Sequence, residues 1–383
     1  MLYNTYMFKH TGKSLLLYTL LFCAYSSARA AEPDSANFPG LTYPIRLTLP
    51  AGEKIGAALY ESAFSLAPAK DYDTLLLEGE MSDPAMRVDI EVKSKAFFLP
   101  NTGYKQTGFH RFPNGRFWAR YNAGPAGRQP LRFVVVNLGV QPGATLTIYS
   151  SELQKEAALR EEREPQQVVP YVPDAALSLP ENAPFTLVRR AQWKAAAPKE
   201  PFTPHAPVYF TLHHTQAHYP ATYAESVAEI QFIQDFHQNG RGWIDIGYHF
   251  LIDPLGNIFE GRPINVVGAH TKNRNTGNIG ISIMGSYHPP VSNPFTAATQ
   301  NSLLAVGTYL KDTYTVNKSS FYAHRDLQSN TDCPGNDLYA KMGTLRDLIF
   351  DPHPVAVPVI PGTIPVSPVQ SRSLRSLMEY LDR

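Results

Sequence analysis

The sequence has little cysteine and almost no net charge, and each shortage excludes a class of protein. Its 383 residues include only 2 cysteines, and the formal net charge is +1. So small a charge argues against capture of nucleic acid by bulk electrostatics, so recognition has to be local. Hydrophobic residues make up 43% of the chain and charged residues 17%, which excludes a disordered chain. The length predicts two domains with appendages.

Long hydrophobic runs are also scarce, and the one at the N-terminus has the pattern of an export signal. Lys9 and Lys13 precede an apolar run over residues 14–24, and small residues end at Ala30. The run is short for a membrane span. We therefore expect residues 1–30 to be a signal peptide, the protein to be secreted or periplasmic, and no transmembrane segment to remain after cleavage.

Removal of this signal would also remove Cys23 and leave Cys333 as the only cysteine. No intramolecular disulfide could then form, although the compartment would permit one. A lone thiol is open to oxidation there, so a bound metal is a natural explanation for it. A buried, inert cysteine is the alternative.

Residues 31–150 are expected to form an all-β, sandwich-like domain of unknown role. Residues 88–92 and 145–148 alternate between apolar and polar, and residues 131–136 are a fuller apolar run. No long helical periodicity interrupts them. Several aromatic residues could stack on sugar rings, or else fill the core of the sandwich: Tyr104, Phe109, Phe112, Phe117, Trp118 and Tyr121.

Two proline-rich stretches separate and end the expected domains. Residues 151–184 predict a charged helix, Glu152 to Glu164, followed by a semi-rigid linker. This linker predicts that residues 185–350 fold independently of the sandwich. Residues 351–383 predict a proline-rich tail that ends in a short amphipathic helix.

Residues 185–350 alternate between strand and helix patterns, which predicts a central mixed sheet flanked by helices. Helices are expected after a capping box at Thr222 and after Thr296. A closing helix is expected from Asp337. The expected strands are residues 208–213, a hairpin of 246–252 with 257–260, residues 279–284 and residues 322–324.

The end of the first of these strands carries a histidine pair, His213 and His214. His324 ends another short apolar run, and Cys333 lies nine residues further on (333 − 324). Two imidazoles and one thiolate would leave a tetrahedral zinc ion one open position, which is the pattern of a catalytic site.

By its motifs, this part of the chain resembles the family of zinc amidases and peptidoglycan recognition proteins, the type-2 N-acetylmuramoyl-L-alanine amidases. The resemblance covers about 165 residues, and the motifs follow the family order. They are Val188-Arg-Arg-Ala-Gln-Trp193, Leu212-His-His-Thr215, Gly242-Trp-Ile-Asp-Ile-Gly-Tyr-His-Phe250, Leu255-Gly-Asn-Ile-Phe-Glu-Gly-Arg262, Val267-Gly-Ala-His270, Asn278-Ile-Gly-Ile-Ser282, Ala323-His-Arg325 and Thr331-Asp-Cys-Pro-Gly335.

The resemblance implies one zinc ion held by His213, His324 and Cys333. Tyr248 and Thr331 match the two polar positions beside the metal and would act in catalysis, for which an oxyanion donor is needed. Four further residues would bind substrate: His214, Trp243, Arg262 and His270. The alternative for His214 is a structural residue, or one that supports a ligand without binding the metal itself. No carboxylate stands out in the sequence as the general base. Glu260 is available for this role, but a structural ion pair with Arg262 explains it equally well.

The implied activity is zinc-dependent hydrolysis of the amide between N-acetylmuramic acid and L-alanine, with peptidoglycan and muropeptides as partners. A non-catalytic peptidoglycan-binding protein is the alternative, and the cysteine ligand favours the enzyme. In a third interpretation, residues 185–350 only anchor the protein to the cell wall, and the sandwich carries the function. Animal members of the family typically carry a disulfide near the first helix. This chain has no cysteine there, so it resembles a bacterial secreted member.

Overall fold

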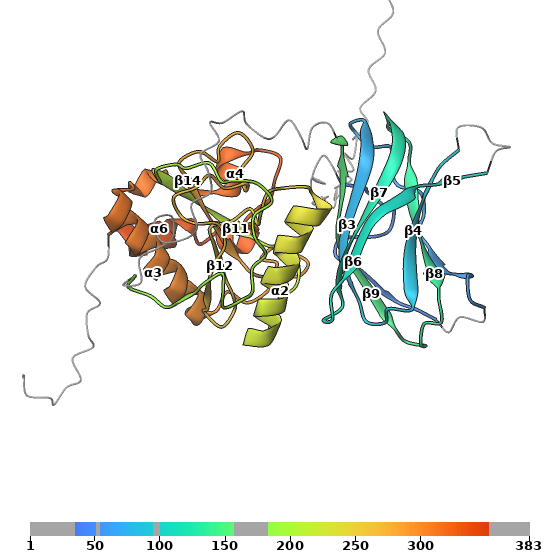
Figure 1. Ribbon diagram of the computed structural model, residues 1–383, viewed down its shortest axis with the longest axis horizontal. Coiled ribbons are helices and arrows are strands. Elements are labelled where there is room, and N and C mark those ends of the chain that lie inside the picture. The colour runs from blue at the N-terminus through green and yellow to red at the C-terminus, as the bar shows by residue number, and fades with distance from the viewer. Residues whose placement is uncertain (1–34, 51–53, 95–99, 157–182, 352–383) are drawn as a thin grey trace, which may run out of the picture.

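The computed structural model of the protein describes residues 35–50, 54–94, 100–156 and 183–351 (Figure 1). The expected signal peptide, the linker from residue 157 to residue 182 and the expected C-terminal tail lie outside these residues. Within the described ranges, no helix combines the length and apolar character that a bilayer span requires.

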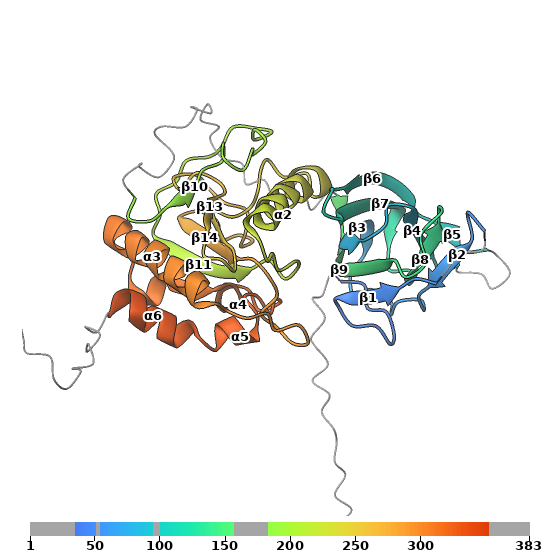
Figure 2. The same cartoon turned by 90° about the horizontal axis from the view of Figure 1, so that it is seen from below.

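Residues 35–156, here called the N-terminal sandwich, form two antiparallel sheets (Figure 2). The five-stranded sheet contains, in order, β1 (Ile45–Thr48), β9 (Thr145–Gln154), β3 (Tyr72–Met81), β7 (Arg116–Gly127) and β6 (Lys105–Arg111). The four-stranded sheet contains β2 (Ala58–Glu61), β8 (Leu131–Asn137), β4 (Met86–Val92) and β5 (Thr102–Gly103). One buried apolar cluster, with side chains from both sheets, lies between them.

The five-stranded sheet is covered on both of its faces. In β3, Leu75 and Leu77 belong to the sandwich core, whereas Leu76 belongs to a second cluster outside it. In β7, Phe117 and Tyr121 are in the core and Trp118 is in the second cluster. This follows from the two-residue period of a strand. The burial of these three aromatic side chains removes them as a sugar-stacking surface.

The last strand of the sandwich is longer than the sequence predicts. Strand β9 continues to Gln154, because Glu152 and Gln154 pair with Leu76 and Thr74 of β3. The expected charged helix is therefore wrong at its first residues, and most of its remainder lies outside the described ranges.

Residues 183–351, here called the C-terminal part, are built on a six-stranded mixed sheet, as expected. Its order is β10 (Leu187–Val188), β13 (Ile258–Glu260), β12 (Phe250–Ile252), β14 (Asn278–Ile283), β11 (Tyr209–His214) and β15 (Phe321–Ala323). β12 and β13 are antiparallel, and the other pairs are parallel. The hairpin is shorter than expected, because the amide of Gly247 donates to Nδ1 of His237 and its carbonyl accepts from Ala269.

Helices lie on both faces of this sheet (Figure 2). The helix α2 (Tyr223–Asp235) continues into the π-helix η1 (Phe236–Gly240) on one face. The opposite face is covered by α3 (Ala297–Tyr314) and α6 (Met342–Phe350), whose buried residues join the cluster of the sheet. Thr222 and Thr296 cap α2 and α3 as expected, each accepting a backbone N–H.

The closing region differs from its prediction in two places. The expected single helix is two, α5 (Asn336–Tyr339) and α6. His324 does not end a strand but begins the short helix α4 (His324–Leu327), directly after β15. A 3-10 turn, η2 (Lys318–Ser320), precedes β15.

Candidate metal centre

The two adjacent histidines of β11 point to opposite faces of the mixed sheet. Leu212 belongs to the apolar cluster under α3 and α6, and His214 points the same way, with Nδ1 accepting the Tyr287 amide at 3.2 Å. His213 lies on the other face with Thr211, whose hydroxyl donates to Asn278 at 2.8 Å. The strand period therefore assigns the two histidines to different environments.

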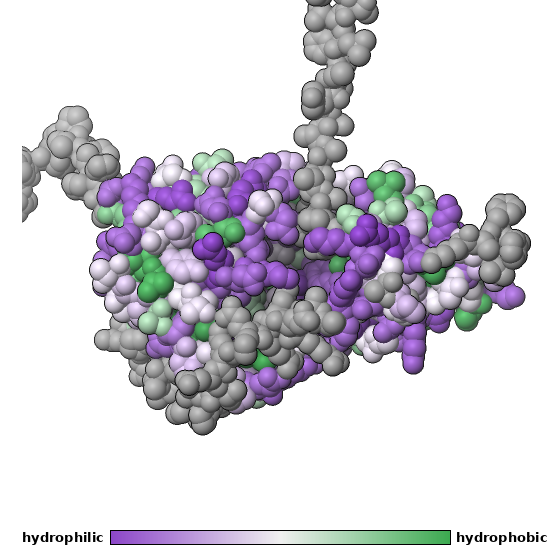
Figure 3. All heavy atoms as spheres, turned by 90° about the horizontal axis from the view of Figure 1, so that it is seen from above, coloured by the Kyte–Doolittle hydropathy of each residue, from purple (hydrophilic) through white to green (hydrophobic). Residues whose placement is uncertain are grey.

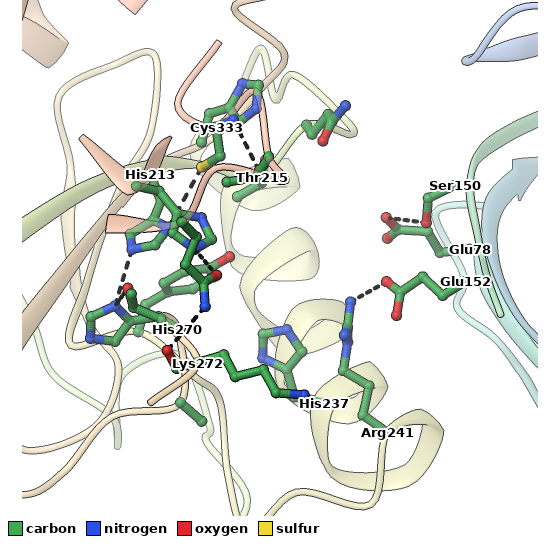
Figure 4. A pocket seen from close by; sticks show the side chains of 18 of the residues that line it. Glu78, Ser150, Glu152, His213, Thr215, His237, Arg241, His270, Lys272 and Cys333 are labelled. Atoms are coloured by element: carbon green, nitrogen blue, oxygen red, sulfur yellow. Dashed lines mark hydrogen bonds and ion pairs between the residues drawn. The ribbon is translucent and has the colours of Figure 1, made fainter. Parts of the chain in front are cut away.

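His213, His324 and Cys333 come together on this second face. Figure 4 shows the first and last of them side by side. One donor atom from each residue lies within 4.8 Å of the others. Nδ1 of His213 is 3.5 Å from Sγ of Cys333. Ligands of a tetrahedral zinc ion at ~2.0–2.3 Å are separated from one another by about 3.3–3.6 Å. The spacing of this pair fits a zinc ion.

A hydrogen-bond chain fixes which nitrogen of His213 faces the cysteine. Nε2 of His270 donates to the carbonyl of Asn278 at 3.2 Å, so Nδ1 of His270 is an acceptor. Nε2 of His213, at 3.0 Å, therefore donates to it. This assignment leaves the lone pair on Nδ1 of His213 directed at Cys333, as a metal ligand requires.

Gln328 fixes the tautomer of His324 in the same way. The amide nitrogen of Gln328 donates to the carbonyl of Lys272 at 3.0 Å, which orients its oxygen toward His324. Nε2 of His324 donates to this oxygen at 2.8 Å, so Nδ1 is left unprotonated. Sequence reasoning missed Gln328, although its position one helical turn after His324 was a usable signal.

Both histidines are also held in the neutral form that binds metal. Burial lowers the pKa of His213 well below its usual range, and the neighbouring His324, His270 and His214 lower it further. Burial lowers the pKa of His324 to about 4. Donor set, spacing, tautomers and charge state together fit a zinc ion.

The same part of the chain matches known proteins. The family described as N-acetylmuramoyl-L-alanine amidase matches residues 203–336. Peptidoglycan-recognition protein SC2 of Drosophila melanogaster is 35% identical over 165 residues, which are 42% of this chain and 85% of that protein. Peptidoglycan recognition protein 1 of Bos taurus is 38% identical over 159 residues, covering 40% of this chain and 80% of that protein.

The chain belongs to the type-2 amidase and peptidoglycan recognition protein family. A solved structure of N-acetylmuramoyl-L-alanine amidase LysC from Clostridium intestinale is 28% identical, with a TM-score of 0.35 over 42% of this chain and 95% of that chain. The family includes both amidases and recognition proteins, so membership alone does not assign an activity.

Tyr248 and Thr331, the two predicted catalytic residues, both line the cleft that contains His213, His324 and Cys333. The ring of Tyr248 lies 5.3 Å from that of His213, between their centroids. Burial, and then the nearby Cys333, raise the pKa of Tyr248, so its hydroxyl stays protonated and able to donate. The hydroxyl of Thr331 accepts the amide N–H of Cys333 at 3.1 Å, so it also supports the loop that carries the cysteine.

The predicted substrate-binding residues have diverse surroundings. His270 lies under His213 as its hydrogen-bond partner. Trp243 packs on His237 and lies beneath the guanidinium of Arg241, 4.9 Å from its ring centroid. Arg262 donates to the carbonyls of Ile246, Val267 and Asp245. Trp243, Arg262 and His270 all line the cleft, and His214 also borders it at the end of β11, although Nδ1 of its ring accepts the Tyr287 amide on the other face. The role of these four residues toward substrate stays a prediction.

The suggested pair of Glu260 with Arg262 is wrong. Glu260 accepts from the backbone of Arg190 at 3.2 Å and lies 3.6 Å from the guanidinium of Arg189. The donors of Arg262 are instead used on backbone carbonyls, and burial lowers its pKa to about 10. Glu260 therefore supports the entry segment of the C-terminal part, and it does not line the cleft.

His213, His324 and Cys333 lie in a cleft of about 1280 Å³, and both parts of the protein line it. Figure 3 looks onto the face where this hollow opens between the two parts, with hydrophilic residues along its rim. The C-terminal part contributes His213, His324, Cys333 and Tyr248. Figure 4 shows its His237 and Arg241 opposite Glu78, Ser150 and Glu152 of the sandwich. The sequence did not predict this second wall.

Proposed function

We propose that the protein is a zinc-dependent N-acetylmuramoyl-L-alanine amidase, which hydrolyses the amide between N-acetylmuramic acid and L-alanine of peptidoglycan. The observation that carries this proposal is the cluster of His213, His324 and Cys333, in which both Nε2 atoms are engaged elsewhere. We further propose, from the sequence pattern, that the protein is exported and acts outside the cytoplasm.

The three ligands would hold one zinc ion, which supplies a Lewis acid and lowers the pKa of water toward neutrality. Attack on the scissile carbonyl develops negative charge on its oxygen, which needs a hydrogen-bond donor. Tyr248 serves as that donor, because its raised pKa keeps the hydroxyl proton in place. Thr331 accepts the amide N–H of Cys333 and so holds the loop that carries this ligand at the wall of the cleft.

The alternative is a recognition protein that binds peptidoglycan without cutting it. Such a protein has no need of a cysteine beside two neutral imidazoles. The presence of Cys333 beside His213, and of a supporting glutamine behind His324, favours the enzyme. The same cleft would serve binding in either case.

The test is digestion of soluble muropeptides by the purified full-length chain, with products identified by mass spectrometry. We expect free stem peptides that begin with L-alanine, and no products after treatment with a chelator until zinc is restored. Cleavage between sugars or within the peptide would refute the bond assignment. Binding without any product would refute the enzyme and support the recognition protein.

A further inference from the structure

The N-terminal sandwich is fixed against the C-terminal part by a cluster that both share. Leu76 and Trp118 of the sandwich belong to one buried apolar cluster with Ile230, Phe232 and Phe236 of α2 and η1. The ring of Phe112 also meets Phe232 edge to face, with centroids 5.6 Å apart. Without this packing these side chains would be exposed, so the two parts share one buried apolar interface.

A buried ion pair crosses the same interface. The guanidinium of Arg116 in β7 donates to both carboxylate oxygens of Glu229 in α2, at 2.8 and 3.1 Å. Their side chains are only 1% and 0% exposed. The guanidinium also lies over the ring of Phe232, 3.9 Å from its centroid. A bidentate pair of this kind fixes orientation as well as proximity.

Polar contacts continue along α2 and η1 toward the cleft. The indole N–H of Trp118 donates to Asp235 at 2.6 Å, and Arg120 donates to the carbonyl of Gly240 at 3.3 Å. At the rim of the cleft, Arg241 of the C-terminal part pairs with Glu152 of β9. The sandwich is thus held in register from the buried pair up to the opening of the cleft.

Through this placement, part of the outer face of the five-stranded sheet becomes a wall of the cleft, opposite His213, His324 and Cys333. Glu78 of β3 and Tyr149, Ser150 and Glu152 of β9 line the cleft. Figure 4 shows Glu78, Ser150 and Glu152 across the cleft from His213 and Cys333. Ser150 donates to Glu78 at 3.1 Å, and the hydroxyl of Tyr149 donates to Glu80 at 3.0 Å. These two hydroxyl protons are therefore used within the wall. Glu78 also accepts from Arg116, and Glu152 accepts from Arg241 and Gln154, so these donors hold both carboxylates in place. A carboxylate oxygen has a second lone pair, so the wall offers the cleft further acceptor positions.

We propose that this wall is a substrate-binding surface, and that it accepts hydrogen bonds from the hydroxyl and amide N–H groups of a peptidoglycan fragment held over the metal cluster. The identity of the ligand rests on the proposed function. The sandwich is then part of the binding site itself, and neither a separate module nor a spacer.

The test measures binding of two ligands to the full-length chain by calorimetry: a disaccharide tripeptide and the same tripeptide without sugars. All proteins carry Tyr248→Phe, so that hydrolysis is slow during the titration. The wall variants are Glu78→Gln and Glu152→Gln. The matched control is Glu91→Gln, which removes a carboxylate from β4 on the far sheet of the sandwich.

We expect each wall variant to weaken binding by roughly tenfold, the cost of one hydrogen bond to a charged group, and the control to change it less than about twofold. Loss with both ligands assigns the wall to the peptide, and loss confined to the disaccharide ligand assigns it to the glycan. If Glu78→Gln does not fold, because Arg116 lies beside it, Glu152→Gln decides alone. Unchanged binding by the folded wall variants overturns the inference.

The two proposals fail separately. An unmodified chain that releases stem peptides, while the wall variants bind normally, upholds the amidase and overturns the wall. A chain that yields no product, but loses affinity in the wall variants, overturns the amidase and upholds the wall.

Discussion

The two faces of the mixed sheet are made by the same strands but differ in polarity and in exposure. On the face toward α3 and α6, Leu212, Ile279, Ile281 and Ile283 form a closed apolar core. On the other face the alternate residues, among them His213 and Gly280, lie under a polar cleft. The apolar face provides stability, and the polar face carries the chemistry at positions one residue away.

The largest effect is expected from removal of the sulfur ligand on the polar face, because it tests whether the two faces have separate roles. Cys333→Ala leaves two imidazoles, which hold zinc poorly. We expect zinc content and amidase activity to be lost together, while the fold persists because the apolar face is untouched. Metal analysis and circular dichroism of the purified variant check this. A variant that stays fully active would show that Cys333 holds no catalytic metal.

A second prediction extends the contrast from the sheet to α2, where a buried charge joins the two parts of the protein. Glu229→Gln removes the closer of the two carboxylates that pair with the buried guanidinium of Arg116 and leaves Glu78 at 3.3 Å. Because a buried charge that loses its bidentate partner is only partly compensated, we expect a loss of about 3 kcal/mol in the free energy of unfolding.

Denaturant unfolding measures this loss, with Asp89→Asn as the control. Asp89 pairs with Arg87 at an exposed site, so its removal should cost less than about 1 kcal/mol. Equal losses in the two variants would mean that the interface does not depend on the buried pair. Such a result would also favour residues 185–350 folding alone, as the proline-rich linker suggests.

The third prediction separates binding of metal from catalysis within the cleft. Tyr248→Phe removes one oxyanion donor and leaves all three ligands, so zinc should stay bound while turnover falls by about 10²–10³. Steady-state digestion of muropeptides, beside metal analysis of the same sample, checks both halves. Loss of zinc, or unchanged turnover, would contradict the assigned role.

The fourth prediction concerns the residue that orients His324. Gln328→Ala removes the acceptor of the Nε2 proton and should weaken zinc affinity by about 10–100-fold, as other supporting hydrogen bonds do. Gln328→Glu keeps an oxygen acceptor at this position and should retain more of the affinity. Competition with a chromophoric chelator measures both. Equal affinities in Gln328→Ala and the unmodified chain would exclude this role.

Sequence reasoning reached the mixed sheet, the helix caps and the three clustered residues, because each depends on local periodicity or on a short motif. It did not reach the interface. The run Leu75-Leu-Leu77 and the order Arg116-Phe-Trp118 are buried on both sides of their strands, and only a partner on the outer face explains that pattern. The proline-rich linker suggested that residues 185–350 fold independently of the sandwich. The composition of a linker does not determine whether the domains on either side of it pack together.

The smallest effect is expected on the apolar face, and two adjacent residues of β14 show it best. Ile281→Val removes one methyl group from the closed core and should lower stability by about 0.5–1.5 kcal/mol, with zinc affinity and turnover unchanged. Its neighbour Gly280 faces the cleft side, where an added Cβ would lie 2.6 Å from the ring of His270. Gly280→Ala should therefore displace His270, disturb the tautomer of His213 and weaken zinc binding. Denaturant unfolding and chelator competition on both variants test the contrast directly. If Ile281→Val weakened zinc binding as much as Gly280→Ala does, the two faces would be coupled, and the division of stability and chemistry between them would be wrong.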